Sequence, residues 1–438
     1  MGQLANGRMR LARRFAAPVV ALALIAALLL LLNSPTRLLA SMVSPTAMSI
    51  LLGLNAIVLV WRIVSVVHAF FDGRYVPKPG RVGTVGLIAI LVAVLAPHAL
   101  ANAWGTAAQA AFASVFTNES GPDGPDPGFI DRGPAGNERI NILIVGVDSA
   151  PGRTETLTDS LMVVSVDPVG KTISMASMPR DLVGVPLGNG NTFSPKINSL
   201  MSYADRHPEQ FPEGGMRSLE NAMGALLGIP IHYYAKLDFT GFVKLVDAVG
   251  GVDINVKKAF FDPKYDGRGG VNEPGVHGWG VTAGPNHFNG WEALAYARSR
   301  YAPGESDFTR AARQQEILLA IKDRVMSGGS VFTRLPDMFE ALGSLVTTDI
   351  PTSRLPDLAA LADDMKSSNT YRAVLNRPIV KTGGTVPIYG SVQIPVLDEI
   401  LAVARKLFPP PGETPESWPP PKATPAPKGT PTPAPLPS

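Results

Sequence analysis

The stretch RINILIVGVD, residues 139–148, decides the kind of fold that this chain adopts. Its apolar run is short and lies between one charged residue at each end, which is typical of a strand buried inside a sheet. Two similar runs follow at 160–167 (SLMVVSVD) and 172–179 (TISMASMP), and the turn DPVGK joins them. We therefore expect a β-hairpin after the first strand.

The elements that follow alternate strands with helices. Residues 233–256 (YYAKLDFTGFVKLVDAVGGVDINV) indicate a strand, a helix, a Gly-Gly turn and another strand. Ser306 is suited to cap a long helix that runs to about Met326. This mixture predicts a mixed α/β fold over residues 139–408, a sandwich in which helices cover a central mixed β-sheet.

Three uncharged apolar runs precede this domain. They are Phe15–Leu32, Leu38–Trp61 and, directly after Arg81, VGTVGLIAILVAVLAPHALANAW. Each is long enough to cross a hydrocarbon core about 30 Å thick. A cleaved signal peptide could account for the first run alone, but not for the other two. We expect three transmembrane helices within residues 15–105.

The basic residues around these runs predict their orientation. Four arginines lie in the N-terminal segment 1–14 and three basic residues lie between the second and third runs, but only Arg37 lies between the first and second. The positive-inside rule then places the N-terminus in the cytoplasm. Three crossings put everything after Trp104 outside, so we expect a multi-pass protein of the cell membrane with an extracytoplasmic domain.

Two further segments have the composition of linkers. Residues 106–138 include the Gly-, Pro- and Asp-rich stretch NESGPDGPDPGFIDRGPAGNE and are expected to be flexible. Residues 409–438 form a proline-rich tail that cannot bury a core. We expect this tail to be disordered, and its purpose cannot be inferred from its composition.

Composition and charge exclude several classes of protein. The net charge of +3 and the lack of a long Lys/Arg run argue against nucleic acid as a partner. The chain has no cysteine, so disulfides, thiol catalysis and cysteine-based zinc sites are excluded. The histidines of the domain are scattered, and we interpret them as structural: His207, His232, His277 and His287.

Residues 296–315 (YARSRYAPGESDFTRAARQQ) concentrate guanidinium groups in a short stretch. Arg310, Arg313 and Gln314 stand at i, i+3 and i+4, so they share one stripe of the predicted long helix. A solvated helix face is the plain interpretation of such a stripe. Apolar neighbours and the scarcity of acidic residues favour an anionic ligand instead, and the guanidinium fork fits phosphate oxygens. Phosphate is therefore the first candidate.

Two more arginines in this stretch can join the stripe only if the chain changes direction. Arg298 and Arg300 are about 200° apart on a continuous helix. They converge only if the helix WEALAYA unwinds near Arg298. Pro303 supports such an ending, since proline disfavours helix in the residue before it.

Carboxylates stand at the ends of the early strands. Asp148 closes the first strand and Asp159 precedes the second. Ligands of open α/β sheets collect at strand ends, and paired carboxylates with phosphate oxygens commonly hold Mg²⁺, although both residues could simply cap turns. Further polar residues lie in the neighbouring loops and suggest a site only in combination: Arg153, Arg180, Asp181, Lys196 and Asn198.

These residues together make the domain resemble the LytR-CpsA-Psr family, bacterial enzymes that attach anionic polymers to peptidoglycan. Seven elements carry the resemblance, in order, over roughly residues 139–327: NILIVGVDS, TDSLMVVSVDP, SMPRD, KIN, DFTGFVKLVDAVGGVDI, GWEALAYARSR and SDFTRAARQQ. Ser160 stands where the family's motif has threonine. Three membrane spans replace the commoner single anchor.

The resemblance implies a mixed sheet between helices with an apolar groove for a polyprenyl tail. It also implies that Asp148 and Asp159 bind Mg²⁺ (or Mn²⁺) at a pyrophosphate, while Asp181 orients groups or accepts a proton. The residues expected to contact the pyrophosphate are Arg180, Arg298, Arg300, Arg310 and Gln314, with Arg313, Arg153, Lys196 and Asn198 beside them. Of these, Arg180, Arg298 and Arg300, together with Asp181, are the expected catalytic residues.

The reaction implied is transfer of a glycopolymer phosphoryl unit from a polyprenyl-pyrophosphate-linked donor to a peptidoglycan sugar hydroxyl, which forms a phosphodiester. The expected partners are this donor, peptidoglycan and membrane lipid. Hydrolysis of the same donor by water is one alternative, and a non-catalytic module that binds lipid or polymer is another. The polymer, the acceptor sugar and the oligomeric state cannot be read from the chain.

Overall fold

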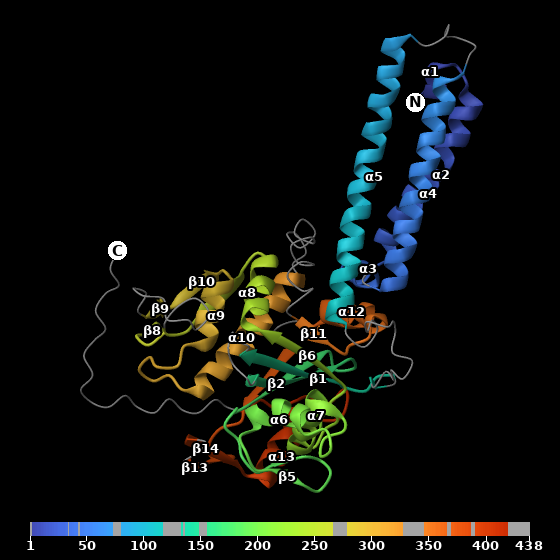
Figure 1. The fold of residues 1–438 in the computed structure, drawn as a ribbon. Helices are drawn as coiled ribbons and strands as arrows, with labels where there is room; N and C mark the ends of the chain where they lie inside the picture. The colour runs from blue at the N-terminus through green and yellow to red at the C-terminus, as the bar shows by residue number, and fades with distance from the viewer. Residues whose placement is uncertain are drawn as a thin grey trace. The chain divides into compact units, whose positions relative to one another are not determined.

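The computed structural model describes residues 2–33, 35–42, 44–72, 80–116, 133–134, 136–148, 156–265, 278–326, 346–365, 369–386 and 390–418. The chain forms two compact units, one of Met1–Asp126 with Pro351–Ala360 and one of Pro127–Ile350 with Leu361–Ser438 (Figure 1). The first unit holds the apolar helices and the second holds the sheet.

Three helices of the first unit are long and apolar enough to cross a membrane. They are α2 (Met9–Leu32), α4 (Pro45–Phe70) and α5 (Arg81–Val115), and the short helices α1 (Gly2–Ala5) and α3 (Pro35–Met42) accompany them. The start expected for the second span, Leu38, was too early, because the Ser44 side chain caps α4 by accepting from the backbone N–H of Ala47. Likewise, α5 continues through the first ten residues assigned to the linker 106–138.

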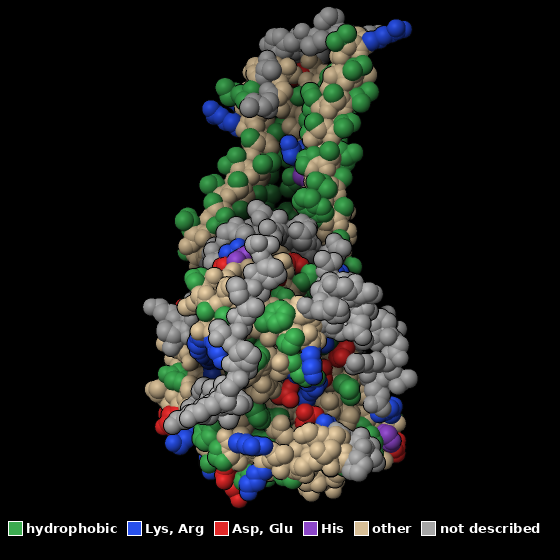
Figure 2. All heavy atoms as spheres, turned by 90° about the vertical axis from the view of Figure 1, so that its left-hand side faces the viewer, with side chains coloured by type: hydrophobic (Ala, Val, Ile, Leu, Met, Phe, Trp, Pro, Cys, Tyr) green, Lys and Arg blue, Asp and Glu red, His purple; other side chains and the backbone are tan. Residues whose placement is uncertain are grey.

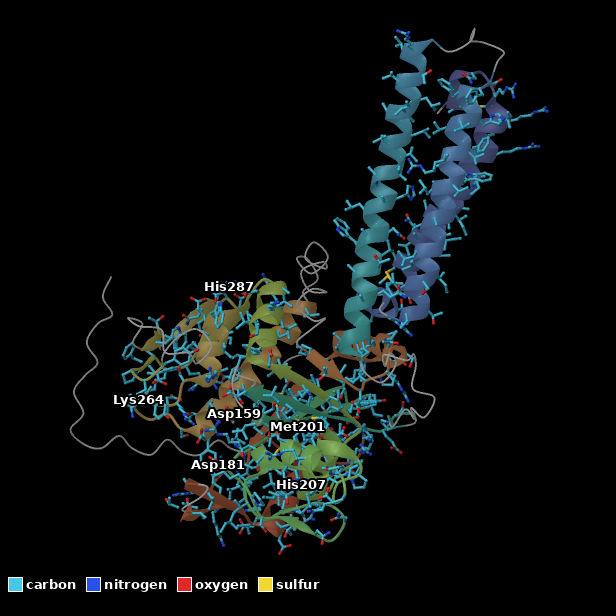
Figure 3. The ribbon with its side chains drawn as sticks, in the orientation of Figure 1. Asp159, Asp181, Met201, His207, Lys264 and His287 are labelled. Atoms are coloured by element: carbon cyan, nitrogen blue, oxygen red, sulfur yellow. The ribbon has the colours of Figure 1, made fainter. Side chains whose placement is uncertain are left out.

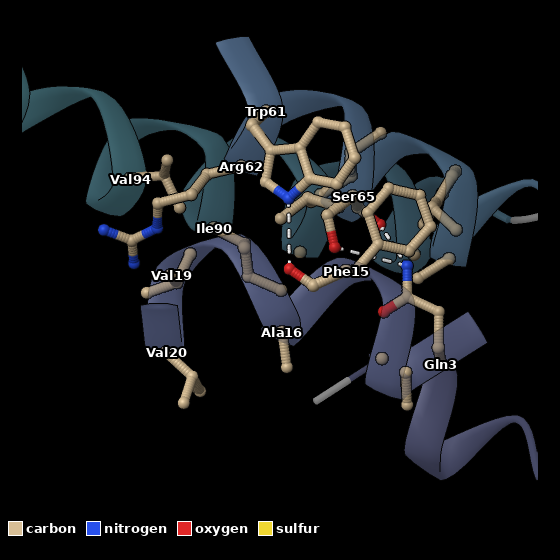
Figure 4. Close-up of a pocket in the computed structure, with 18 residues that line it drawn as sticks. Gln3, Phe15, Ala16, Val19, Val20, Trp61, Arg62, Ser65, Ile90 and Val94 are labelled. Carbon is tan, nitrogen blue, oxygen red and sulfur yellow. Dashed lines mark hydrogen bonds between the residues drawn. The ribbon is translucent and has the colours of Figure 1, made fainter. Parts of the chain in front are cut away.

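Polar side chains connect these helices across a cavity of about 720 Å³ that is lined mainly by apolar residues of α2, α4 and α5 (Figure 4). The indole of Trp61 on α4 donates to the Phe15 carbonyl oxygen on α2 at 3.0 Å (Figure 4). Asn55 of α4 donates to the His98 carbonyl oxygen of α5 at 3.0 Å, and their side chains also meet at 2.7 Å. Such interhelical hydrogen bonds are the usual polar links between membrane helices.

A six-stranded mixed sheet forms the centre of the second unit, as predicted. The strand order is β11-β6-β1-β2-β3-β12. Neighbours are antiparallel except for the parallel pairs β1–β6 and β3–β12. The predicted hairpin is β2–β3, whose register pairs Asp167 with Thr172. The strands are β1 (Ile140–Asp148), β2 (Leu157–Asp167), β3 (Thr172–Met178), β6 (Tyr233–Asp238), β11 (Val346–Thr348) and β12 (Thr370–Val374).

Helices cover both faces of this sheet, which explains why its central strands are largely buried on both sides. On one face, Leu143, Val163 and Ala176 pack in one core with α6 (Leu200–Arg206), α7 (Gly214–Leu227) and α13 (Leu397–Leu407). On the other face, Met162 and Met175 pack against α10 (Asp307–Met326). Figure 1 shows the two helical layers on either side of the strands.

The predicted strand–helix–turn–strand segment is β6, α8 (Phe239–Ala248) and β7 (Val252–Val256). Gly250 and Gly251 form the turn with φ of 84° and 81°, in the left-handed region that favours glycine. Next to α8 lies α9 (Gly290–Arg298), where a Cβ on Gly290 would stand 2.2 Å from the Val243 carbonyl oxygen. The close approach of α9 to α8 therefore requires glycine at this position.

Further short elements complete the second unit. They are β4 (Val185–Pro186), β5 (Thr192–Phe193), η1 (Ile197–Ser199), β8 (Phe260–Asp262), β9 (Trp279–Val281), β10 (Gly284–Phe288), β13 (Val380–Val386) and β14 (Gly390–Pro395). A 3₁₀ turn, η4 (Thr352–Arg354), and α12 (Leu355–Asp364) follow β11 in the chain, and their residues up to Ala360 belong to the first unit. In addition, β7 pairs with β10 and packs against α10, so a small lobe flanks the main sheet.

The last described residues, 409–418, form a C-terminal strap that is hydrogen bonded to the sheet domain. Arg139 donates from Nε to the Pro409 carbonyl oxygen at 2.6 Å, and the Gly412 N–H donates to Asp167 Oδ2 at 2.8 Å. Ten residues assigned to the proline-rich tail 409–438 therefore pack against the domain. Residues 419–438 lie outside the described part of the chain.

Candidate active site

The two predicted metal-binding aspartates lie on neighbouring strands at one end of the sheet. Asp148 is buried and closes β1. In the β1–β2 register, Gly146 pairs with Ser160 and Val147 pairs with Thr158, so Asp159 is the extra residue of a β-bulge. A bulge changes the direction in which the side chain points, and bulges are frequent beside active sites. The sequence placed Asp148 correctly at the end of β1, but Asp159 lies inside β2 rather than before it, because β2 already begins at Leu157.

Arg180 pairs with Asp159 at this end of the sheet. Its Nη1 lies 2.6 Å from Asp159 Oδ1, and each side chain is 20% exposed. Burial alone would lower the pKa of Arg180, but the charge and hydrogen bond of Asp159 outweigh it and raise that pKa. The Nε atom of Arg180 is buried and has no hydrogen-bond partner. A donor is therefore available for a further acceptor.

Two arginines of the predicted cluster share Asp307 at the start of α10. Arg310 Nη1 lies 3.2 Å from Asp307 Oδ1, and Arg300 Nη1 lies 3.7 Å from the same atom. Burial lowers the pKa of Arg310, Asp307 opposes this effect, and the nearby charges of Arg180 and Arg300 lower it further. Arg180, Arg310 and Asp307 line the same cleft, and Arg300 reaches that cleft through Asp307.

The turn between α9 and α10 is what allows this convergence. As predicted, α9 ends at Arg298, and Ser299 leaves the helix with φ −54° and ψ 131°. The buried carboxylate of Asp262 accepts from the backbone N–H groups of Arg300 and Tyr301 at 2.8 and 3.1 Å. Asp262 thereby fixes the backbone that carries Arg300, a role that the sequence did not reveal.

Arg298 differs from the other arginines, because none of the described residues forms an ion pair or hydrogen bond with its guanidinium. That group instead lies 4.1 Å from the centre of the Phe239 ring. Phe239 directly follows Asp238, which lies beside Val147 in the parallel β1–β6 register. Arg298 therefore sits at the same end of the sheet as Asp148, with its donors unused.

Arg313 is not brought into the cluster. Its guanidinium donates to the carbonyl oxygens of Tyr296, at 2.7 Å, and of Ser299, and it pairs with Glu305. It also lies 4.8 Å from the centre of the Phe260 ring, and it is buried. Helical spacing placed Arg313 on the arginine stripe, but its position toward α9 makes it a clamp between the two helices rather than a pyrophosphate contact.

Gln314 joins the site to β2. Its Oε1 accepts from the Ser160 hydroxyl at 2.7 Å, and its Nε2 donates to the Ala297 carbonyl oxygen at 3.5 Å. Ser160, which stands where the family's motif has threonine, thus keeps a hydroxyl for this contact. Gln314 therefore links the first turns of α10, which line the cleft, to the β-bulge at Asp159.

The predicted loop residues beside Arg180 also gather here. Lys196 Nζ lies 2.5 Å from Asp181 Oδ1, so the Asp181 carboxylate is ion paired. The backbone N–H of Asn198 donates to the Arg180 carbonyl oxygen at 3.2 Å, and Asn198 is buried. Lys196 and Asn198 therefore support the loop that carries Arg180. Arg153 lies outside the described residues, so its predicted role stays a prediction.

The cleft itself is narrow, about 20 Å³, which is room for roughly one water molecule. Arg180 and Arg310 line it opposite Asp159 and Asp307, and Gln393 contributes a buried Oε1 without a hydrogen-bond partner. Figure 2 shows basic and acidic side chains side by side on one face of the domain. The arginines have the carboxylates as counterions here, so an anionic ligand would have to compete with them.

Histidine takes no part in this cleft among the residues that the structure describes. Figure 3 shows His207 and His287 well away from Asp159, whereas Asp181 lies close to it. His207 stacks on Tyr203, and the ring of His232 accepts from the backbone N–H of Asn141 at 2.9 Å. His277 lies outside the described residues.

A divalent cation fits this site only with help from a substrate. Within the described ranges, no group of three Asp, Glu or His side chains forms a ready-made metal site. Asp148 and Asp159, at one end of adjacent strands, supply two carboxylates. Mg²⁺ typically uses one or two carboxylates and completes its shell with water and substrate phosphates. The donor set suits that arrangement, and the predicted metal stays a prediction.

Three acidic residues at the site were not predicted: Asp262, Glu305 and Asp307. Glu305 and Asp307 lie within the arginine stretch itself, so their spacing from Arg313 and Arg310 could have indicated ion pairs. Asp262 ends a short strand about forty residues before Arg300, and its role depends on the fold of the β8–β9 lobe. Only the three-dimensional structure could identify it.

The structure defines an α/β domain whose cleft is lined by arginines and carboxylates, in a chain with three helices suited to cross a membrane. The profile of the LytR_cpsA_psr family matches residues 113–381, and the chain belongs to this family. The resemblance seen in the sequence is thereby confirmed.

Two curated relatives match the chain. Regulatory protein MsrR of Staphylococcus aureus (strain Mu50 / ATCC 700699) is 35% identical over 225 residues, which cover 51% of this chain and 60% of that protein. Polyisoprenyl-teichoic acid--peptidoglycan teichoic acid transferase TagV of Bacillus subtilis (strain 168) is 35% identical over 213 residues, which cover 48% and 50%. The chain thus spans 50–60% of the length of these relatives.

Solved structures are also similar. The crystal structure of B. subtilis TagV is 27% identical, with a TM-score of 0.47 over 62% of this chain and 98% of that chain. The structure of TagT bound to LI-WTA is 23% identical, with a TM-score of 0.46 over 65% and 94%.

Proposed function

We propose that this chain transfers a glycopolymer phosphoryl unit from a polyprenyl-pyrophosphate-linked donor to a sugar hydroxyl of peptidoglycan. The observation that carries this proposal is the cleft in which Arg180 and Arg310 lie beside Asp159, with Arg300 and Arg310 sharing Asp307. Membership of the family supports it, as does the similarity to TagV, whose name describes transfer of teichoic acid to peptidoglycan.

The arginines suit a diphosphate because their present partners are exchangeable. Arg180 and Asp159 are each partly exposed, and Arg310 reaches Asp307 at 3.2 Å. A bound diphosphate presents several charged oxygens and would compete for these donors, while the unpartnered Nε of Arg180 adds one more. Arg298 needs no exchange, since no described residue forms an ion pair or hydrogen bond with its guanidinium, which lies against the Phe239 ring.

The chemical step in this proposal is an in-line displacement at phosphorus. The acceptor hydroxyl oxygen forms a bond to the sugar-linked phosphorus, and the bond from that phosphorus to the bridging oxygen breaks. Polyprenyl phosphate leaves with the bonding electron pair. Arginines stabilise charge on the phosphoryl oxygens and on the leaving phosphate, and a single well-placed arginine can contribute roughly 10³–10⁵ in rate.

A divalent cation belongs to this proposal through Asp148 and Asp159, which would hold Mg²⁺ or Mn²⁺. The ion would supply further positive charge next to the diphosphate. Asp159 would then divide its two oxygens between the ion and Arg180, whose Nη1 already contacts Oδ1.

The proton of the acceptor hydroxyl needs a base. Asp181 stands directly after Arg180 and lines the cleft. Its ion pair with Lys196, at 2.5 Å, holds the carboxylate in place beside the cleft. Asp181 therefore orients the acceptor or takes its proton in our proposal.

The location of the reaction follows from the predicted topology. With the N-terminus in the cytoplasm, the catalytic domain lies outside the membrane, beside both lipid-linked donor and peptidoglycan. The polyprenyl tail of the donor would lie in an apolar groove, as the family resemblance implies. The reaction draws its energy from the pyrophosphate bond, so no nucleotide is needed outside the cell.

One experiment separates the proposal from its alternatives. The purified full chain is incubated with polyprenyl-pyrophosphate-linked donor, Mg²⁺ and peptidoglycan oligomers, and products are identified by mass. A phosphodiester-linked conjugate is expected, and it should disappear with Asp159→Ala. Free phosphorylated glycan with or without acceptor would instead identify a hydrolase, and unchanged donor would identify a binding module.

A further inference from the structure

A second cavity of about 190 Å³ adjoins the arginine cleft in the sheet domain. Val374 lines both, and the two lie along neighbouring faces of α10: Gln314 faces the cleft, whereas Glu316 faces the second cavity. A helix with its side chains is roughly 10 Å across. A chain-like molecule bound in the second cavity could therefore reach the arginine cleft with its next unit.

The C-terminal strap builds one wall of this cavity. The backbone N–H of Trp418 donates to the Arg372 carbonyl oxygen at 3.0 Å, and the backbone N–H of Arg372 donates to the Ser417 hydroxyl at 3.0 Å. The strap thus continues along the edge strand β12 and places the half-buried Trp418, which also packs against the core beneath α7 and α13, among the residues that line the cavity. An aromatic face with polar groups around it matches a sugar ring, which has an apolar C–H face and a rim of hydroxyls.

The charges around the cavity favour an anion. Lys257 and Arg372 reach the same carboxylate oxygen of Glu316 only at 3.8 and 4.0 Å. Neither cationic group has a hydrogen bond to a described side chain, while Glu316 accepts from the Tyr296 hydroxyl at 2.9 Å. Two cations thus share one carboxylate, and the guanidinium of Arg372 keeps its donor fork available for a carboxylate ligand.

The structure assigns this cavity, which we name the strap pocket, to the acceptor: it binds one sugar unit of peptidoglycan through its ring and through a carboxylate of the peptide that the sugar carries. This assignment rests on the proposed transfer function. The volume supports a single unit, since it lies below the roughly 300 Å³ at which pockets for larger ligands begin. The ring lies against Trp418, and the carboxylate pairs with Arg372 and Lys257.

Binding to the full chain in detergent tests the assignment without any chemical step. The probes are a disaccharide muropeptide, which carries free carboxylates, and neutral chitobiose of the same ring number. We expect the muropeptide to bind at least tenfold more tightly. Arg372→Gln and Lys257→Gln should each remove most of the preference for the muropeptide. Trp418→Leu should weaken the binding of both probes. Equal binding of the two probes, or an undiminished preference in both charge variants, overturns the assignment.

Two controls keep folding and the donor site separate from this result. Lys381→Gln removes an exposed lysine of β13 outside the pocket and should leave both affinities unchanged. Inorganic pyrophosphate should bind the Arg372→Gln protein with the same affinity as the unaltered chain. If the chain binds muropeptide selectively but transfers nothing to it, the pocket is upheld and the proposed transfer is refuted. If Arg372→Gln transfers at the normal rate at low acceptor concentration, the assignment of the strap pocket is refuted and the proposed transfer is not.

Discussion

The carboxylate of Asp262 and the backbone N–H of Arg300 are joined by a 2.8 Å hydrogen bond inside the domain. The same carboxylate accepts from the N–H groups of Tyr301 and Lys264, at 3.1 and 3.0 Å, and Asp262 is only 1% exposed. Three backbone donors therefore converge on one buried anion. This anion orients the chain at the point where α9 has ended, and so determines where the Arg300 guanidinium can reach.

Asp262→Asn should consequently impair both stability and transfer. The amide keeps the shape but loses the charge, and one of its two ends can no longer accept a hydrogen bond. A buried donor left without an acceptor costs about 1–3 kcal/mol. We expect a fall in the free energy of unfolding of that size and at least a tenfold loss of transfer. Asp253→Asn, at a largely exposed carboxylate, is the matched control and should change neither.

The contrast between Arg298 and Arg313 gives a second prediction. Arg298→Ala removes a guanidinium whose neighbour is the Phe239 ring, so it should cost only about 0.5–1 kcal/mol of stability. Transfer should nevertheless fall by roughly 10³-fold or more, because this arginine is free to bind the diphosphate. Thermal unfolding and turnover of the same preparation measure both effects. Retained transfer would count directly against the proposed chemistry.

Arg313→Leu should impair mainly stability, whereas Arg298→Ala impairs mainly transfer. This change leaves the half-buried Glu305 without its cation and breaks the contacts to Tyr296 and Ser299. Removing one partner of a buried ion pair costs about 3–5 kcal/mol. Stability should therefore fall much further than in Arg298→Ala. An Arg313→Leu protein as stable as the unaltered chain would show that the clamp is not needed.

These two arginines also show how far the sequence can predict the site. Helical periodicity correctly placed Arg310, Arg313 and Gln314 on α10, and Pro303 correctly indicated that the preceding helix ends near Arg298. Periodicity reports the face of one helix, however, and not which neighbour that face meets. Whether a guanidinium meets α9, as Arg313 does, or the end of the sheet is decided by packing between distant segments.

The fold was predicted more completely than the site, for a related reason. The strands from 139 to 179 pair with their neighbours in the chain, and the segment 233–256 carries its own strand, helix and turn patterns, so local patterns were sufficient to recognise these elements. The edge strands β11 and β12 are short and pair with strands far away in the sequence. No local signal marks such strands, and the same holds for the strap, whose composition is that of a linker.

Asp307 competes with any anion for two arginines, which leads to a third prediction. Asp307→Asn removes a charge that lies 3.2 Å from Arg310 and 3.7 Å from Arg300. The net positive charge of the cleft rises, so inorganic pyrophosphate should bind more tightly, by roughly tenfold or about 1.4 kcal/mol. Asp323→Asn removes a carboxylate near the other end of α10 and is the matched control. Weaker pyrophosphate binding in Asp307→Asn would show that this carboxylate positions the arginines rather than competing with the ligand.

Tyr296 should make stability depend on pH in the alkaline range. Burial raises the pKa of this phenol well above its usual value of 10.0, and the charge and hydrogen bond of Glu316 raise it further. Above about pH 10, the unfolded chain loses the phenolic proton while the folded chain keeps it. Stability is therefore present below pH 10 and declines above it, by at most about 1.4 kcal/mol per pH unit for this group.

Chemical denaturation of Tyr296→Phe and the unaltered chain between pH 8 and pH 11 measures this effect. The stability advantage of tyrosine over phenylalanine should shrink as the pH rises above 10. Glu316→Gln should reduce the slope only in part, because burial is the larger cause of the raised pKa. If the free energies of unfolding of Tyr296→Phe and of the unaltered chain change in parallel with pH, the prediction is contradicted.

The last prediction concerns the strap, residues 409–418, which is the part of the proline-rich C-terminal segment that packs against the domain. Asp167 is fully buried, pairs with Arg139 at 3.2 Å and accepts from Gly412. Asp167→Ala leaves the Arg139 charge buried without its counterion, which should cost about 3–5 kcal/mol. Asp364→Ala removes the partner of an exposed pair with Lys171 and should cost at most about 1 kcal/mol.

Two truncations locate the boundary of the folded part directly. Deleting residues 419–438 should leave the unfolding temperature unchanged. Deleting 409–438 should lower it by several degrees, because Arg139 then loses the Pro409 carbonyl oxygen and Asp167 loses the Gly412 N–H. Equal unfolding temperatures for the two truncated chains would show that the strap contributes nothing to stability, and that the folded domain ends at residue 408.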